Sequence, residues 1–396
     1  MVPGTDNEPR EGLARHVYEI SKRLSLLGFD IVNLVPAPDH SLKAELVENS
    51  YKLLKVPISN WGSARFFLNK IDRHLSMWPH YYGYREVVSK ILKNTNKPIV
   101  LHTHAFYSIA QPRTRTKLCK RLVTLHGFGQ LDIIAKKQGH VKANLLHLFL
   151  KKLYSKAGDC YTTFSPNMKT LAVRFYGLNP DAIVVVPHGV DAKFFSEQVK
   201  VEQKRQLETR FKLEKEFKIL FLGHLTSGKG LDILLKAARI LRSRRSDFQL
   251  ILKMGHSRTC VEAIETVRRL GIEDTVRIIT ERLSQSDLRS LYHVSDVFVN
   301  YFFLSGSSTA LLEGMASGVA PIIYQASPLR DIVDSQSGVV LKTLNPLELA
   351  EGIEMLAEDR RLTERIGKTA MERTLRNYDW DTAIVPKYIS VYNALL

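Results

Sequence analysis

Short runs of apolar and β-branched residues alternate with stretches of helical periodicity along most of the chain. Within each run the apolar residues are continuous rather than alternating, which is typical of strands covered by helices on both faces. The alternation predicts an α/β architecture with doubly wound parallel sheets. The predicted strands are 30–36, 98–102, 121–125, 160–164 and 182–187 in the first half, and 218–222, 248–253, 276–280, 297–300 and 320–324 in the second.

With 396 residues the chain is too long for one ordinary core, and two α/β domains fit its length. We place the division near 187–195, just before a charged stretch with helical spacing. The first recognisable element is a helix that starts near Gly12, with no strand before it. Doubly wound domains normally open with a central strand, so we expect that first strand to be missing from the N-terminus.

Composition restricts the class of protein. Hydrophobic residues make up 44% of the chain and charged residues 24%, as in soluble globular proteins. No apolar run is long enough to cross a bilayer, and the start lacks the pattern of a signal peptide. The 3 cysteines lie far apart and show no metal-ligand spacing, which indicates a reduced, cytoplasmic protein.

The net charge of +17 is concentrated in the first half of the chain. Residues 1–195 contain 28 Lys and Arg against 14 Asp and Glu, whereas the remainder contains 29 against 26. This asymmetry predicts an anionic partner for the first half: nucleic acid, anionic lipid head groups or a phosphate-bearing acceptor. No recognisable nucleic-acid-reading motif is present, so we expect no nucleic acid partner.

Residues 136–156 form a basic amphipathic pattern in which six lysines surround an apolar stripe of Leu145, Leu146, Phe149 and Leu153. Such a helix can lie on an anionic membrane surface. A core-facing helix with solvated lysines is an equally ordinary interpretation. The regional charge favours the membrane interpretation slightly and indicates peripheral attachment at the inner face of the membrane.

A glycine-rich segment, GHLTSGKG at 223–230, lies between a predicted strand and a predicted helix. Such a turn lets backbone N–H groups approach a phosphate at a positive helix end, and Lys229 adds a formal charge. The segment nearly matches the triphosphatase loop GxxxxGK[ST], but Gly230 stands where the magnesium-binding hydroxyl is required. The sequence therefore predicts phosphate binding without triphosphatase chemistry.

A second segment of small residues, SGSSTALLEGMASG at 305–318, follows the predicted strand 297–300 and opens another helix. Its start predicts a second anion site at a helix N-terminus. Glu313 lies about two turns inside, where a carboxylate can accept hydrogen bonds from a ribose diol. An isolated glutamate is more often a solvated helix residue, but two small-residue loops in one domain favour binding.

His126, in TLHGFG, directly follows a predicted strand, and ligands bind at that end of parallel strands. A single histidine is usually structural, so His126 is weak evidence by itself. His102 and His104 form an H-T-H run that allows a metal site, but no Asp, Glu or Cys partner follows at ligand spacing. We therefore expect no metal.

In their order and spacing these segments together resemble the retaining glycosyltransferases of family 4, which have the GT-B fold. The resemblance covers nearly the whole chain, from EPREGLARHVYEI through TLHGFG, VVVPHGVDAKFF, ILFLGHLTSGKGLDILLKAA and SGSSTALLEGMASGVAPII to NYDWDTAIVPKYISVYNALL. It implies two facing Rossmann-like domains with parallel sheets. The implied parts are an acceptor-binding domain at 1–188, a donor-binding domain at 189–375, and a helix at 376–396 that crosses back to the first domain.

The resemblance implies transfer of a hexose-type sugar from a UDP- or GDP-sugar to a glycan or lipid-linked acceptor, with retention of configuration. No cofactor and no obligatory metal are implied. His126 would contact the donor sugar near its reacting carbon, and Lys229 would neutralise the leaving diphosphate. The implied donor-binding residues are Gly12, His224, Lys229, Ser305, Gly306, Thr309, Ala310 and Glu313, with backbone amides of Thr309 and Ala310 on phosphate and Glu313 on the ribose.

The sequence departs from the family pattern at several positions. His224 replaces an arginine, Ser305 replaces a glutamate eight residues before Glu313, and His188 replaces the asparagine of the P-N-G-V-D segment. Two alternatives therefore stay open beside transfer. One is a catalytically weak nucleotide-sugar-binding protein of the same fold, and the other is a GT-B nucleotide-sugar epimerase.

Overall fold

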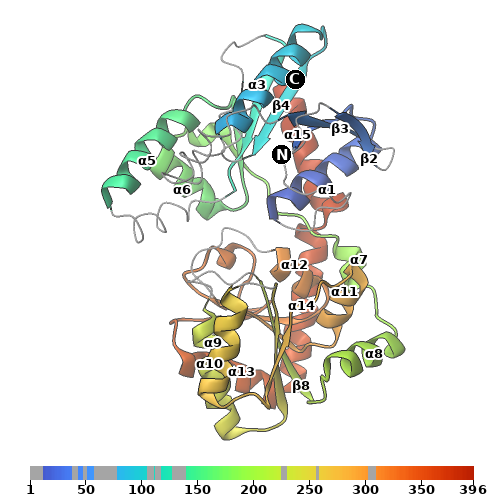
Figure 1. Cartoon of the computed structure of the whole chain (residues 1–396), viewed down its shortest axis with the longest axis vertical. Helices are drawn as coiled ribbons and strands as arrows, with labels where there is room; N and C mark the ends of the chain where they lie inside the picture. The colour runs from blue at the N-terminus through green and yellow to red at the C-terminus, as the bar shows by residue number, and fades with distance from the viewer. Residues whose placement is uncertain are drawn as a thin grey trace. The chain divides into compact units, whose positions relative to one another are not determined.

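The computed structural model describes residues 12–37, 43–47, 51–57, 78–104, 111, 117–126, 140–223, 230–255, 258–301 and 309–396. The chain forms two compact units (Figure 1). Unit 1 comprises residues 1–187 and 384–396, and unit 2 comprises residues 188–383. Each unit is described by itself below. Residues 1–11, before which the first strand is expected to be missing, lie outside the described residues.

Unit 1 contains seven described strands in two sheets. They are β1 (Val32–Ala37), β2 (Lys43–Val47), β3 (Tyr51–Pro57), β4 (Ile99–His104), β5 (Cys119–Thr124), β6 (Cys160–Thr163) and β7 (Ile183–Val185). One sheet has the order β4-β5-β6-β7 and is parallel throughout. The other has the order β1-β3-β2, with β1 and β3 parallel and β2 antiparallel to β3.

The antiparallel hairpin β2–β3 corrects the expectation of uniformly parallel strands in the first half. Lysines at 43, 52 and 55 interrupt the apolar residues of these two strands. A strand of this kind lacks the continuous apolar run by which buried parallel strands are recognised, and the hairpin was therefore not predicted. Two neighbouring strands joined by a short turn need no crossover helix, so an antiparallel pair is the natural arrangement.

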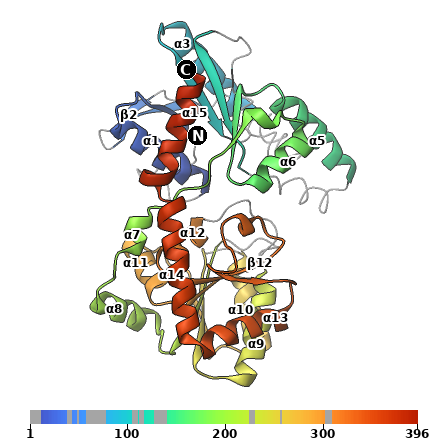
Figure 2. The ribbon, with the colours of Figure 1, turned by 180° about the vertical axis from the view of Figure 1, so that it is seen from behind.

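The helices of unit 1 are α1 (Gly12–Leu26), α3 (Trp78–Lys93), α5 (His140–Tyr154), α6 (Pro166–Tyr176) and α15 (Val385–Leu395). α6 has a Ser165 N-cap and ends at Gly177, whose φ of 65° is left-handed. α5 and α6 pack on one apolar cluster that includes Leu150 and Tyr154. The C-terminal α15 contacts α1, and both views show the two helices side by side (Figures 1 and 2).

Unit 2 is built on a six-stranded parallel sheet with the order β10-β9-β8-β11-β12-β13. Its strands are β8 (Phe217–Leu222), β9 (Phe248–Lys253), β10 (Val276–Ile279), β11 (Val297–Asn300), β12 (Ala320–Tyr324) and β13 (Val339–Leu341). Its helices are α7 (Ala192–Ser196), α8 (Val201–Phe211), α9 (Leu231–Arg244), α10 (Arg258–Leu270), α11 (Gln285–His293), α12 (Thr309–Ala316), α13 (Pro346–Glu358) and α14 (Arg360–Asn377).

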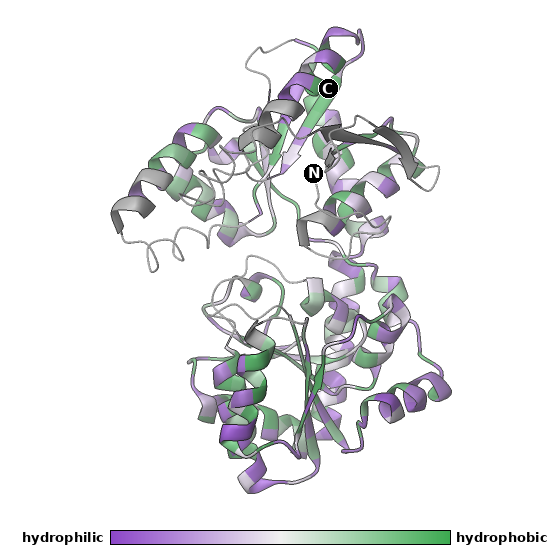
Figure 3. Cartoon of the chain, viewed as in Figure 1, coloured by the Kyte–Doolittle hydropathy of each residue, from purple (hydrophilic) through white to green (hydrophobic). Residues whose placement is uncertain are grey.

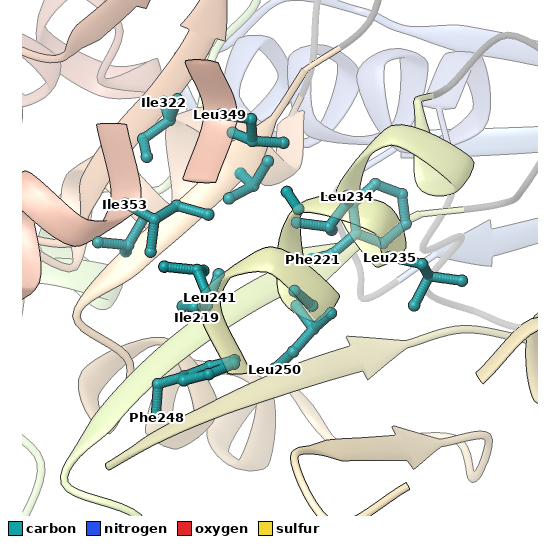
Figure 4. Packing of buried hydrophobic residues seen from close by; sticks show 14 of the residues in the cluster. Ile219, Phe221, Leu234, Leu235, Leu241, Phe248, Leu250, Ile322, Leu349 and Ile353 are labelled. Atoms are coloured by element: carbon teal, nitrogen blue, oxygen red, sulfur yellow. The ribbon is translucent and has the colours of Figure 1, made fainter. Parts of the chain in front are cut away.

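Helices cover both faces of the unit 2 sheet, as the continuous apolar strands predict. From β8, Phe217, Ile219 and Phe221 enter one core together with residues of α9, α10 and α13 (Figure 4). Leu220 points to the opposite face, where α7, α8, α11 and α12 pack. Figure 3 shows apolar residues along the strands and hydrophilic residues on the outer helix faces. Burial on both faces explains the absence of alternation in the sequence.

Asp379 and Trp380, which follow α14, contact the first residues of unit 2. The Asp379 carboxylate accepts hydrogen bonds from the backbone N–H of Ala192, Asp381 and Thr382 at 3.1–3.2 Å. The ring of Trp380 covers Gly189 so closely that a Cβ on Gly189 would lie 2.2 Å from Cδ2. These contacts keep the chain in unit 2 as far as Ala383, and α15 begins two residues later at Val385.

Candidate active site

The strand order of unit 2 reverses between β8 and β11. From β8 the chain moves outward to β9 and β10, returns to β11 on the other side of β8, and continues outward to β12 and β13. The helices that follow β8 and β11 cover opposite faces of the sheet. In open parallel sheets a ligand binds at such a reversal, outside the carboxyl ends of the two strands. The two segments singled out in the sequence, 223–230 and 305–318, follow β8 and β11 along the chain.

Gly230, just before α9, lies against Tyr301, just after β11. Its φ is +67°, and a Cβ added there would lie 2.2 Å from the backbone oxygen of Tyr301, the first residue after β11. Both the left-handed backbone and the close approach exclude a side chain. The residue that breaks the triphosphatase motif is thus required by the packing of the loop, and α9 begins directly after it, at Leu231.

The second loop opens α12 at Thr309, followed by Ala310. The first N–H groups of a helix have no partner within it, and the helix dipole makes this end favourable for anions. Both residues are half-buried. Glu313 lies one turn further along α12 and is 4% exposed, so the surface-helix alternative for this residue is excluded.

The Glu313 carboxylate has a defined partner. The hydroxyl of Tyr292, on α11, lies 3.0 Å from Glu313 Oε2 and 3.1 Å from the backbone oxygen of Ala310, so it donates between the two acceptors. Tyr292 is fully buried in the core beneath α12. Because Tyr292 bonds to it, this buried carboxylate is held in one orientation. A fixed orientation is what a group that binds ligand hydroxyls needs.

Four residues predicted for the donor site fall outside the described residues. His224 and Lys229 belong to the loop after β8, and Ser305 and Gly306 to the loop after β11. Their predicted roles stay predictions. The described ends of these segments include Gly230 and Tyr301, which lie in contact at the reversal.

In unit 1, His126 follows β5 at the carboxyl end of the parallel sheet. Its Nε2 lies 3.0 Å from Nδ1 of His104, the last residue of the neighbouring β4. The register pairs His104 with Thr124, two residues before His126. The rings of Phe164 and His16 approach His126 edge-on, with centroid distances of 5.0 and 5.5 Å. His126 therefore lies among aromatic rings that define its orientation.

A hydrogen-bonded polar layer lies next to this histidine pair. His102 Nε2 is 2.7 Å from the Thr124 hydroxyl, and His102 Nδ1 is 2.8 Å from the hydroxyl of Tyr392 on α15. Thr124 in turn bonds Thr162 at 2.6 Å. Burial lowers the pKa of His102 to about 3, so its ring is neutral and donates through one nitrogen while accepting at the other.

α1 contributes to the same region through His16. The Nε2 of His16 lies 3.2 Å from the hydroxyl of Tyr388 on α15. Gly12, the predicted donor-binding residue at the helix start, lies one turn before His16. His16 thus brings α1 close to His126 within unit 1, and the donor-binding role of Gly12 stays a prediction.

The sequence did not reveal the partners of the two site residues. His16 and Tyr292 occupy ordinary amphipathic-helix positions, and Tyr388 lies more than 200 residues from His126. His104 was noted only as part of a metal alternative. Among the described residues no group of three or more His, Cys, Asp or Glu is arranged to hold a metal ion. The one usable signal was a histidine at or just beyond the carboxyl end of two successive strands, His104 as the last residue of β4 and His126 after β5 ends at Thr124.

Two family comparisons match consecutive segments of the chain. Residues 10–194 match the family described as Glycosyltransferase Family 4, and residues 202–373 match the family described as Glycosyl transferases group 1. The chain belongs to the group 1 and family 4 glycosyltransferases. The junction between the matched segments lies just after the division between units 1 and 2.

Among curated relatives of this glycosyltransferase is the D-inositol 3-phosphate glycosyltransferase of Corynebacterium diphtheriae. It is 28% identical over 247 residues, which cover 59% of this chain and 56% of that relative. Just over half of that relative's length is therefore matched.

Solved structures confirm the predicted GT-B fold. A sucrose-phosphate synthase from Thermosynechococcus elongatus superposes with a TM-score of 0.78 at 17% identity, covering 97% of this chain and 94% of that one. Anabaena HepE, crystallised with UDP and glucose, superposes with a TM-score of 0.64 at 14% identity, covering 96% and 94%. At these identities the similarity shows the fold alone.

Proposed function

We propose that this glycosyltransferase moves a hexose-type sugar from a UDP- or GDP-sugar to a glycan or lipid-linked acceptor, with retention of configuration and without a metal. The observation that carries the donor part is the reversal of strand order between β8 and β11. Both small-residue segments follow strands that end there, and Gly230 contacts Tyr301 at that place. The HepE structure in complex with UDP and glucose supports a nucleotide-sugar donor for this fold.

The proposed chemistry follows from where charge develops. As the bond to the leaving diphosphate breaks, negative charge grows on the phosphate oxygens and positive charge on the sugar ring. The N–H groups of Thr309 and Ala310 at the start of α12, together with Lys229, stabilise that negative charge. Donors fixed in place before the reaction need no reorganisation, so they lower the barrier more than water does.

Glu313 takes the ribose in this proposal. A carboxylate accepts hydrogen bonds from both hydroxyls of a cis-diol, and Tyr292 holds this carboxylate in place. In unit 1, His126 contacts the donor sugar near its reacting carbon. We propose retention because the motifs resemble those of retaining glycosyltransferases. NMR of the anomeric proton of the first product tests it.

For the acceptor we propose a molecule at an anionic membrane surface. α5 contains no acidic residue, and its exposed side chains include Leu148, Phe149, Lys151 and Lys152. Of the predicted apolar stripe, Leu153 packs against the core that contains Leu150 and Tyr154, whereas Phe149 is 42% exposed. Exposed apolar residues beside lysines favour the boundary of an anionic bilayer. Within the described part of the chain, no helix combines the length and apolarity needed to cross a bilayer.

The acceptor proposal is tested by flotation with vesicles of phosphatidylglycerol and phosphatidylcholine. The double variant Lys151→Glu/Lys152→Glu is expected to lose binding to anionic vesicles. Lys236→Glu, which changes an exposed lysine on α9, is the matched control and is expected to bind like the wild type. Equal binding of both variants argues against an α5 surface.

The whole proposal is tested by a donor screen against membrane extract, followed by mass spectrometry. A product that gains one hexose and requires both donor and extract supports transfer. An altered sugar nucleotide without acceptor indicates the epimerase alternative. Binding of donor without any product indicates the catalytically weak alternative.

A further inference from the structure

His126 is held by other residues of unit 1 through contacts of defined geometry. β4 and β5 run in parallel, and both carry a histidine at or just beyond their carboxyl ends. This places His104 Nδ1 3.0 Å from His126 Nε2, within hydrogen-bond distance. The His104 side chain is 4% exposed, so solvent does not compete for this bond.

The rings around the pair restrict its motion. His104 stacks on His102 with a centroid distance of 4.3 Å and an interplanar angle of 34°. His102 is itself anchored by the hydroxyls of Thr124 and Tyr392. Phe164 contacts His126 edge-on with an interplanar angle of 73°. His104 therefore has one orientation, and it presents Nδ1 to His126.

The protonation of His104 restricts the pair further. Burial, followed by the nearby histidines His102, His126 and His16, lowers the pKa of His104 well below its ordinary value. A neutral imidazole has one N–H and one acceptor nitrogen, so one ring of the pair donates and the other accepts. Whichever ring donates, the bond assigns the proton of His126 to a particular nitrogen, and Nδ1 of His126 takes the complementary role.

We propose that His104 is a positioning residue that fixes the tautomer and ring orientation of His126, so that His126 presents Nδ1 in one protonation state to the reacting sugar. This rests on the proposed function of His126, because only a ligand contact makes the tautomer matter. His104 itself touches no substrate in this account. It acts through His126, as an orienting group acts through a general base.

The test uses three substitutions of His104 that differ in where they place a polar atom. The side chain of His104→Asn places a polar atom near the position of Nδ1, His104→Gln near that of Nε2, and His104→Leu removes both. We expect His104→Leu and His104→Gln to lower kcat for sugar release or transfer by about 10- to 100-fold, as misplacement of a catalytic group does. The kcat of His104→Asn is expected to lie within about 3-fold of the wild-type value.

Nucleotide affinity separates positioning from a general structural defect. The donor nucleotide is proposed to bind unit 2, so the Kd of UDP or GDP is expected to stay within about 2-fold in all three variants. His102→Gln is the matched control, because His102 lies in the same buried layer and stacks on His104 while its two ring nitrogens bond hydroxyl groups. Its effect on kcat is expected to be smaller than that of His104→Leu.

A spectroscopic measurement is independent of turnover. Long-range ¹H–¹⁵N spectra of histidine-labelled protein report which nitrogen of each ring is protonated, and the His126 signals are assigned with His126→Gln. We expect a single His126 tautomer in the wild type and His104→Asn, and a mixture in His104→Leu. A mixture in the wild type, or unchanged His126 signals in His104→Leu, overturns the positioning role. Absence of any nucleotide-sugar turnover by the wild type overturns the proposed function instead, since the spectra need no substrate.

Discussion

The hydroxyl of Tyr292 lies 3.0 Å from the carboxylate of Glu313 and orients it within the interior of unit 2. If that carboxylate binds the ribose, removal of its negative charge weakens nucleotide binding more than it lowers the stability of the fold. Glu313→Gln keeps the shape but weakens the accepted hydrogen bonds, which for charged groups contribute about 1.5–3 kcal/mol. We expect UDP or GDP to bind about 10- to 100-fold more weakly. Isothermal titration calorimetry measures the Kd of the nucleotide.

Tyr292→Phe is the paired variant. It removes the donor to Glu313 and is expected to lower the free energy of unfolding by about 1 kcal/mol, with a smaller effect on nucleotide affinity than Glu313→Gln. An unchanged nucleotide Kd in Glu313→Gln contradicts the ribose role.

Gly230→Ala tests the contact between Gly230 and Tyr301. The new Cβ would meet the Tyr301 oxygen at 2.2 Å, so the backbone has to move. Gly271→Ala is the control, because its φ of +63° is similar but nothing lies within 4 Å of its Cβ. We expect Gly271→Ala to cost about 1 kcal/mol of unfolding free energy, and Gly230→Ala roughly 1–3 kcal/mol more. Equal losses of unfolding free energy in urea would contradict the close contact between Gly230 and Tyr301.

Acid destabilisation is expected from the neutral histidines of unit 1. The folded pKa of His102 is about 3, against 6.5 ordinarily, and that of His104 is also lowered. Below pH 6.5 the unfolded chain therefore binds more protons than the folded one. The stabilisation by His102 is complete above pH 6.5 and decreases as pH falls towards 3, by about 1.4 kcal/mol per pH unit, and the lowered pKa of His104 acts in the same direction.

Urea unfolding between pH 4 and pH 7 measures this dependence. His102→Gln keeps a polar atom near the Nε2 position and cannot titrate, so its stability is expected to fall less steeply with decreasing pH. An identical slope in His102→Gln and the wild type contradicts a neutral, buried His102.

Gly189→Ala tests the packing of the Trp380 ring on Gly189 in unit 2. Trp380 covers Gly189, and the nearest ring atom would lie 2.2 Å from the new Cβ. The indole is 3% exposed and has little room to move, so we expect a loss of about 1–3 kcal/mol of unfolding free energy. A fluorescence change of the three tryptophans accompanies the shift of the ring. Wild-type stability in thermal unfolding would contradict this packing.

The sequence was sufficient for the parts of the site that local patterns encode. The glycines and small residues of 223–230 and 305–318 identify strand–helix turns without knowledge of distant contacts. The continuous apolar strands 218–222 and 297–300 were correctly predicted to be buried. Their adjacency at the reversal follows from the order of a doubly wound sheet.

Contacts between distant segments could not be inferred from these patterns. Tyr292 and Glu313 meet because α11 and α12 pack on the same face, which depends on the whole sheet. Tyr392 reaches His102 across 290 positions of sequence. The hairpin β2–β3 was missed because lysines break its apolar runs. The sequence could not separate the exposed from the buried residues of α5, because residues 148–150 are all apolar.

Calorimetric titration of the full chain with UDP, GDP and their sugar conjugates tests the central claim most directly, that unit 2 binds a nucleotide-sugar donor at the reversal of its sheet. We expect one nucleotide series to bind with a Kd below the millimolar range, and Glu313→Gln to weaken that binding about 10-fold or more. Absence of binding by every nucleotide at millimolar concentration would contradict the account.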